Sequence, residues 1–185
     1  VKLFPQFVNN LFEESAFGNL IDSALLIKWD DKIILNCNDN YLTKEWAKKF
    51  KKQNEKIDLL LAPHSASGPY PSSFRNLSIT AKKNEVKKLQ KQYVKHWAEV
   101  VNIVSPEMAV PCAAEYIIAG EQSWKNPYIG LAEAKDAKKV FDKKFGIKIT
   151  KAIAMDCGSI LNLKTKKLTN KPNRKFSSIF KKNYI

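Results

Sequence analysis

Two short apolar runs near the start of the chain have the pattern of β-strands. Residues 24–29 (ALLIKW) and 32–37 (KIILNC) are rich in large aliphatic side chains, and Asp30 and Asp31 lie between them. Two such runs joined by two turn-forming residues predict a β-hairpin. Four further apolar runs also predict strands, at residues 57–62, 108–112, 151–155 and 160–163.

Three stretches repeat apolar residues with the spacing of an amphipathic helix. The clearest is 86–100, where apolar residues recur every three or four positions and lysines fill the other face. Thr43 is suited to cap an earlier helix that carries Trp46, and a later helix over 134–145 is followed by Gly146, a common terminator. Strands that alternate with helices predict a layered α/β fold.

The composition is that of an ordinary globular domain. The chain has 185 residues, of which 44% are hydrophobic and 27% charged, and these values exclude collagen-like, disulfide-rich and disordered proteins. No apolar run approaches the roughly 18 residues of a membrane span, and the first residues lack the layout of a signal peptide. We expect a cytoplasmic protein with no membrane partner. Residues 1–172 are assigned to the domain and 173–185 to a lysine-rich tail.

The net charge is +14, from 32 basic and 18 acidic residues, and only Arg75 and Arg174 are arginines. Planar, bidentate recognition of phosphate and guanine favours arginine, whereas lysines distributed along a chain are typical of solvated polar faces. A nucleic-acid partner is therefore not expected. The positive potential of such a chain is better suited to attracting an anionic small molecule. The three cysteines are far apart and never form a C-x-x-C motif, so we expect reduced thiols that are mostly buried.

Reactive side chains in α/β folds gather just after the carboxyl ends of strands, and three such places contain candidate residues. Asp39 follows the second strand of the predicted hairpin, where it is interpreted as a metal ligand, a general base or a turn-forming residue. Glu115 or Tyr116, after the run at 108–112, faces a pocket or belongs to a tight strand-to-helix turn. If Asp39 is a metal ligand, Asp39→Ala abolishes activity with little loss of stability.

A third candidate is the loop at 63–71, whose three prolines and one glycine restrict its conformation. Adjacent side chains on an extended chain point to opposite sides, so His64 and Ser65 are not a nucleophile–base pair. The loop is interpreted as the wall of a substrate or metal site, or as a structural segment with a buried histidine. Under the first interpretation, His64→Ala impairs kcat or KM without unfolding the protein. The candidate substrate-binding residues are then His64, Ser65, Ser67, Gly68 and Tyr70, and no catalytic residue is assigned.

Four segments, in their order along the chain, resemble the second half of metallo-β-lactamase-fold proteins. They are ALLIKWDDKIILNCND, IDLLLAPHSASGPYPSSF, VNIVSPEMAVPCAAEY and MDCGSILNLKTKKLT. Within that superfamily the pattern is most similar to the branch that contains CMP-N-acetylneuraminate hydroxylase. The resemblance covers roughly Asp22 to Pro172.

The resemblance implies an αββα sandwich, of which this chain is the second half: a mixed sheet flanked by helices. Asp39 matches the bridging aspartate of the family's metal site. The last histidine ligand would fall near Cys112 and Ala113, where this chain has no histidine, and the family's H-x-H-x-D-H motif does not occur in it. The resemblance therefore implies a divalent metal, zinc or iron, held mostly by residues outside this chain, and a missing N-terminal half as partner.

The activity implied by the resemblance is that of a hydrolase or hydroxylase acting on an anionic sugar- or nucleotide-linked small molecule. The alternatives are a non-catalytic binding or scaffold paralogue and a basic nucleic-acid-binding protein. Because the first half would cover one face of the sheet, the chain alone is expected to expose apolar surface there, to hold metal only weakly, and to aggregate or form a homo-oligomer.

Overall fold

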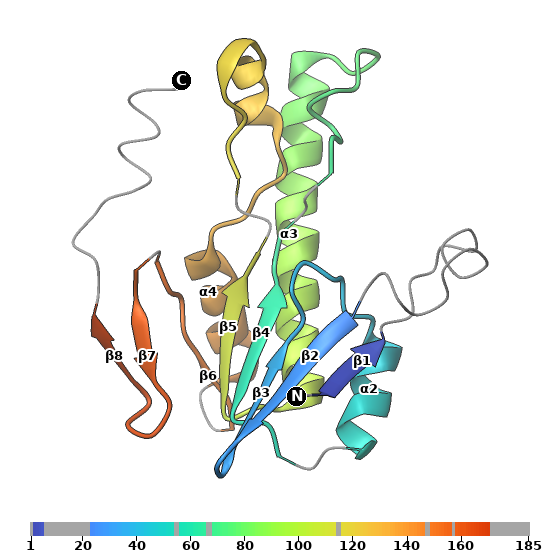
Figure 1. Ribbon diagram of the computed structural model, residues 1–185. Helices are drawn as coiled ribbons and strands as arrows, with labels where there is room; N and C mark the ends of the chain where they lie inside the picture. Colours follow the sequence, from blue (N-terminus) through green and yellow to red (C-terminus); the bar gives the residue numbers. More distant parts are fainter. Residues whose placement is uncertain are drawn as a thin grey trace.

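The computed structural model describes residues 2–5, 23–53, 56–65, 68–113, 116–146, 149–156 and 158–170. They form an α/β fold, as the sequence predicts. A six-stranded sheet has its strands in the order β1-β2-β3-β4-β5-β6, and β7 and β8 form a separate hairpin (Figure 1). The strands are β1 (Lys2–Pro5), β2 (Ser23–Trp29), β3 (Lys32–Asn36), β4 (Leu59–Pro63), β5 (Met108–Cys112), β6 (Lys151–Ala152), β7 (Ile160–Asn162) and β8 (Lys167–Asn170).

The direction of the strands changes at β3. β1, β2 and β3 are antiparallel, whereas β3, β4, β5 and β6 run parallel to one another. The turn between β2 and β3 places Asp30 at φ 48°, in the left-handed region that short acidic side chains tolerate. Because neighbouring parallel strands end at the same edge of a sheet, the loops after β3, β4 and β5 meet there.

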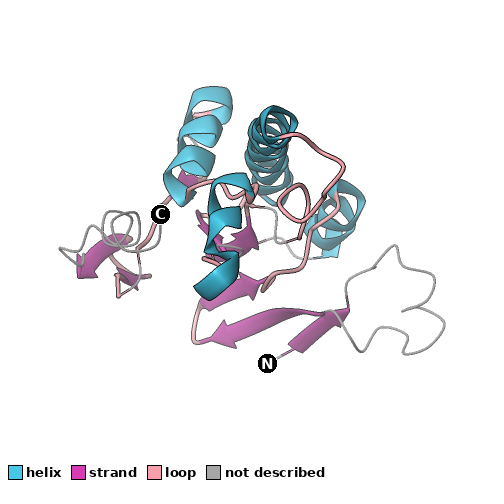
Figure 2. Ribbon diagram, turned by 90° about the horizontal axis from the view of Figure 1, so that it is seen from above, coloured by secondary structure: helices cyan, strands magenta, loops and turns pink. Residues whose placement is uncertain are grey.

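Three helices cover one face of the sheet (Figure 2). They are α2 (Lys44–Gln53), α3 (Ile79–Val104) and α4 (Ala134–Phe145). Alternate strand residues such as Leu26, Leu35 and Leu60 point toward the helices and pack against Trp97 and Val101 of α3. All five side chains are at most 1% exposed, so this layer is the main core of the protein.

The opposite face of the sheet is only partly covered. The β7–β8 hairpin packs its apolar side chains over Met108 and Val110 of β5, which are buried. Ile27 and Ile34, which pair across β2 and β3 and lie on this same face, are half-buried. The sequence predicts one open apolar face, and the structure shows that the hairpin closes part of it.

Most predicted elements are present, with shifted boundaries. Thr43 Oγ1 accepts a hydrogen bond from Trp46 N (3.1 Å), which confirms the predicted cap of α2, and Gly146 ends α4 with a φ of 72°. α3 starts at Ile79, seven residues before the apolar repeat, and is capped by Ser78. The strand predicted over 151–155 is paired only at 151–152. A 3₁₀ helix, η2 (Gly120–Tyr128), was not predicted, and the predicted tail at 173–185 lies outside the described residues.

Glu99 of α3 joins the three helices. Its carboxylate accepts hydrogen bonds from Lys144 Nζ of α4 and Lys44 Nζ of α2, each at 2.7 Å. The hydrogen bonds from Lys144 and Lys44 lower the pKa of Glu99 to about 2 from its usual 4.5. Because the pKa is lowered in the folded state, these bonds stabilise the fold above pH 4.5, and this stabilisation is lost as the pH falls toward 2.

Glu99→Gln is expected to lower the free energy of unfolding by about 1–2 kcal/mol at neutral pH. Urea unfolding from neutral to acidic pH measures this difference, which should shrink as the pH falls below the ordinary pKa of glutamate. The control Glu133→Gln removes an exposed pair with Lys135 and should cost less than about 0.5 kcal/mol. If the difference in free energy of unfolding between the wild type and Glu99→Gln stays constant at low pH, the Glu99 charge contributes nothing to stability.

Candidate functional site

Three loops that the sequence singles out lie together at the carboxyl edge of the sheet. Cys37 N, just after β3, donates to Leu61 O of β4 (2.9 Å), and Pro63 at the end of β4 is in register with Cys112 at the end of β5. The loops that begin at residues 37, 64 and 113 therefore start side by side (Figure 1). In open α/β sheets this edge is where ligands bind.

Asp39 lies in the turn that follows β3, and its side chain is exposed. The turn itself is shaped by its neighbours: Asn36 Oδ1 accepts from Asn38 N (2.9 Å), and Cys37 O accepts from Asn40 N (3.0 Å). Within the part of the chain that the structure describes, no hydrogen bond or ion pair engages the Asp39 carboxylate. The turn-forming role thus belongs to Asn36, and the Asp39 carboxylate faces solvent at the sheet edge.

His64, the first residue after β4, is fully buried. Its Nδ1 lies 3.3 Å from Cys112 O, and its Nε2 lies 3.0 Å from Ala132 O, in the segment that leads into α4. Both ring nitrogens therefore face backbone carbonyls. The imidazole braces the ends of β4 and β5 against residue 132, and in this structure it presents no ring nitrogen to a ligand at the surface.

Ser65 also links the loop after β4 to residue 132. Ser65 is 4% exposed, and its hydroxyl accepts a hydrogen bond from Ala132 N (2.7 Å). The sequence predicts that His64 and Ser65 point to opposite sides, but in the structure both side chains reach the same residue, His64 at the carbonyl and Ser65 at the amide of Ala132. We call these three residues the Ala132 clasp. The clasp shapes the loop, and direct contact of its two side chains with a substrate remains a prediction.

Gly68 and Tyr70 lie farther along the same loop and closer to solvent. Gly68 O accepts a hydrogen bond from the Tyr116 hydroxyl (3.4 Å), which links this loop to the one after β5. A hydrogen bond with Glu85 raises the pKa of the half-buried Tyr70 above its usual value. Tyr70 and Tyr116 thus place phenol groups on the loops after β4 and β5. Ser67 and Glu115 lie outside the described residues.

The donors at this edge do not make a metal centre by themselves. Burial raises the pKa of Cys112 to about 12 and that of Cys37 well above its usual value, so both thiols stay protonated. The nitrogens of His64 face carbonyls, which leaves the Asp39 carboxylate. Over the described ranges, no group of three or more His, Cys, Asp or Glu side chains is placed to hold a metal ion.

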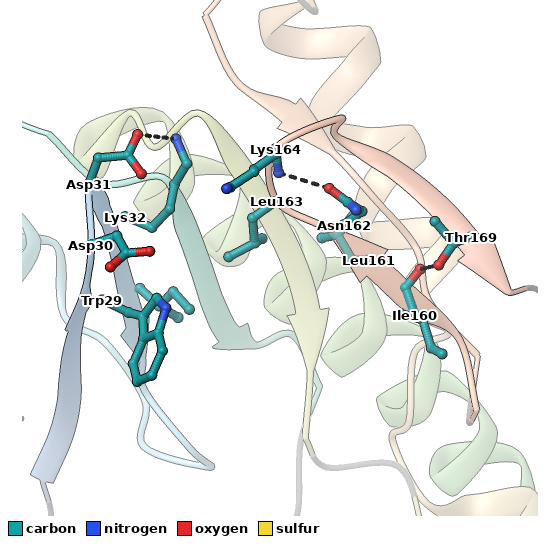
Figure 3. Close-up of a pocket in the computed structure, with 11 residues that line it drawn as sticks. Trp29, Asp30, Asp31, Lys32, Ile160, Leu161, Asn162, Leu163, Lys164 and Thr169 are labelled. Atoms are coloured by element: carbon teal, nitrogen blue, oxygen red, sulfur yellow. Dashed lines mark hydrogen bonds and ion pairs between the residues drawn. The ribbon is translucent and has the colours of Figure 1, made fainter.

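A separate cleft lies at the opposite edge of the sheet, between the β2–β3 turn and the β7–β8 hairpin (Figure 3). Its volume is about 470 Å³, and its walls are mainly apolar, with an ion pair of Lys32 and Asp31 (3.1 Å) at one end. Lys32 begins β3, whereas Asp39 follows the end of that strand, so the cleft is not part of the candidate site. The lining residues are Trp29, Asp30, Asp31, Lys32, Ile34, Ile160, Leu161, Asn162, Leu163, Lys164 and Thr169.

Comparisons of the sequence with protein-family models and with curated proteins find no match. Among the described helices, none is both long enough and apolar enough to cross a bilayer.

Proposed function

We propose that this chain supplies the substrate-binding half of a metal-dependent enzyme of the metallo-β-lactamase type. Its ligand is an anionic sugar- or nucleotide-linked small molecule, bound at the carboxyl edge of β3, β4 and β5. The observation that carries the proposal is the meeting of three loops at that edge, with Asp39, Tyr70 and Tyr116 on them. The finer fold assignment, half of an αββα sandwich, belongs to the same proposal.

Two features of the sheet support this assignment. The exposed carboxylate of Asp39 is not needed to shape its turn, so it is available as one ligand of a divalent ion. The half-buried apolar residues on β2 and β3 leave room on the second face of the sheet for another layer. The described residues hold no metal centre of their own, and in this proposal the remaining ligands come mostly from outside this chain.

A non-catalytic binding protein is the second candidate, and the Ala132 clasp favours it. His64 would be the most versatile catalytic side chain at this edge, but both of its nitrogens face backbone carbonyls. His64 is the only histidine of this loop, and it has a structural role. The loop is therefore better suited to binding a ligand than to transferring protons. The two candidates differ in whether Asp39 binds metal.

Titration with Mn²⁺ tests the role of Asp39 on the chain itself. The paramagnetic ion broadens NMR signals of nearby amides even when it binds weakly, so one carboxylate suffices for detection. We expect broadening centred on residues 37–40 in the wild type and its loss in Asp39→Asn, with the free energy of unfolding changed by less than about 1 kcal/mol. The matched control is Asp156→Asn, which changes another exposed aspartate.

Two results would count against the enzyme assignment. Broadening that persists in Asp39→Asn would remove this residue from the metal site. Broadening centred on Asp30 and Asp31, in the cleft at the opposite edge, would move the preferred cation site away from the carboxyl edge. Either result would leave the binding-protein alternative as the better account of the Ala132 clasp.

A further inference from the structure

The first half of α3 projects well beyond the carboxyl edge of the sheet, with η2 beside it (Figure 1). We call residues 72–91 and 116–128 the α3 tip. Its two parts are joined by lysines: Lys82 Nζ donates to Ser72 O (2.9 Å) and lies 5.7 Å from the Trp124 ring, while Lys125 Nζ donates to Ser73 Oγ (3.1 Å). The tip is therefore one packed unit.

The α3 tip exposes an unusual number of large apolar side chains. Of the eight that are exposed among the described residues, four belong to this unit, with exposed fractions between 43% and 61%. They are Phe74, Ile79, Ile117 and Trp124. Several large apolar side chains exposed on one packed unit are a feature of contact surfaces.

Basic side chains accompany these apolar residues. The tip contains seven lysines and arginines but only two acidic residues. One of the two, Glu85, is paired with Lys88 (3.5 Å); the other, Glu121, is exposed. Lys83 and Lys87, both exposed, lie one turn apart on α3. The surface thus combines apolar side chains with an excess of positive charge.

We propose that the α3 tip docks on an anionic lipid bilayer. Trp124, Phe74 and Ile79 enter the headgroup region, and Arg75, Lys83 and Lys87 contact the lipid phosphates. Tryptophan and aliphatic side chains beside lysines are the composition of the membrane interface, and positive charge close to the surface adds affinity for anionic lipids. The sequence predicts no membrane partner because it lacks a spanning run, but surface docking requires none.

Two other occupants fit the surface less well. A phosphodiester backbone provides no apolar contact for Ile79 and Ile117, and proteins that recognise nucleic acids favour arginine over lysine. Protein interfaces are depleted in lysine, which predominates here among the charged residues. Neither alternative uses both the aliphatic residues and the lysines of the tip.

Co-sedimentation with lipid vesicles tests the proposal. The protein should bind vesicles of phosphatidylcholine and phosphatidylserine at about 70:30 and should not bind vesicles of phosphatidylcholine alone. Trp124→Ser and the double variant Lys83→Glu/Lys87→Glu should each lower the partition coefficient by about tenfold or more. Should Trp124→Ser fail to fold, as judged by circular dichroism, Ile79→Ser replaces it, since Ile79 is 61% exposed.

The chain offers matched controls away from the tip. Trp29 is 73% exposed at the opposite edge of the sheet, and Lys139 and Lys143 are exposed on α4. Trp29→Ser and Lys139→Glu/Lys143→Glu should change the partition coefficient by less than about twofold. The proposal is overturned if the wild type ignores anionic vesicles, if the controls lose as much binding as the tip variants, or if the tip variants lose binding to DNA but not to vesicles.

Discussion

His64→Ala is expected to lower the free energy of unfolding by about 3 kcal/mol. The substitution empties a fully buried site and removes the single ring N–H that donates to one of two neighbouring backbone carbonyls, Cys112 O or Ala132 O, according to the tautomer. Buried carbonyls without a donor retain the cost of desolvation. The variant should therefore loosen the loops after β4 and β5 together.

Urea unfolding measures this effect, and His96→Ala is the natural control. His96 is half-buried and bonds one carbonyl, Leu42 O (2.7 Å), so its loss should cost about 1 kcal/mol. His64→Gln, which keeps one donor, should recover part of the stability. If His64→Ala unfolds like the wild type but loses kcat or ligand affinity, the earlier expectation from the sequence is right and His64 contacts the ligand directly.

Asp58→Ala is expected to cost about 2–3 kcal/mol at neutral pH. Its carboxylate is fully buried at the start of β4, where it accepts a hydrogen bond from Ile33 N (2.8 Å) and pairs with Lys32 and Lys56, each at 3.3 Å. Burial alone would raise the pKa of Asp58, but the Ile33 amide and the two lysines outweigh it, and the pKa lies below 3.8. The stabilisation is therefore present above pH 3.8 and lost as the pH falls below it.

The control for Asp58 is Asp31→Asn, since Asp31 pairs with the same lysine (3.1 Å) but is 70% exposed. It should change the free energy of unfolding by less than about 0.5 kcal/mol. Equal losses in the Asp58 and Asp31 variants would show that the Lys32 charge matters and the buried position does not.

The regular elements of the fold could be predicted because their signals are local. Alternating or continuous apolar runs marked β2 to β5, and apolar spacing of three to four marked α3 and α4. The residues at helix ends could be predicted for the same reason, as Thr43 and Gly146 show. The meeting of three loops at one edge followed from strand polarity, which an α/β pattern implies.

What the sequence could not reveal depends on contacts between distant residues. The Ala132 clasp joins side chains at 64 and 65 to a backbone segment 67 or 68 positions away, and no pattern marks that pairing. The docking of the β7–β8 hairpin, which creates the cleft, is also tertiary. Lysines occur along the whole chain, yet sixteen of the thirty lie on α2, α3 and α4, because these helices form the outer layer.

The most direct test of the proposed function is a crystal structure of the complete gene product with Zn²⁺, read by anomalous diffraction. We expect a metal peak at the carboxyl edge of β3, with the Asp39 carboxylate as one ligand and other ligands from outside residues 23–170. A fully ligated metal that lacks Asp39, or a peak in the cleft lined by Asp30 and Asp31, would contradict the proposed function.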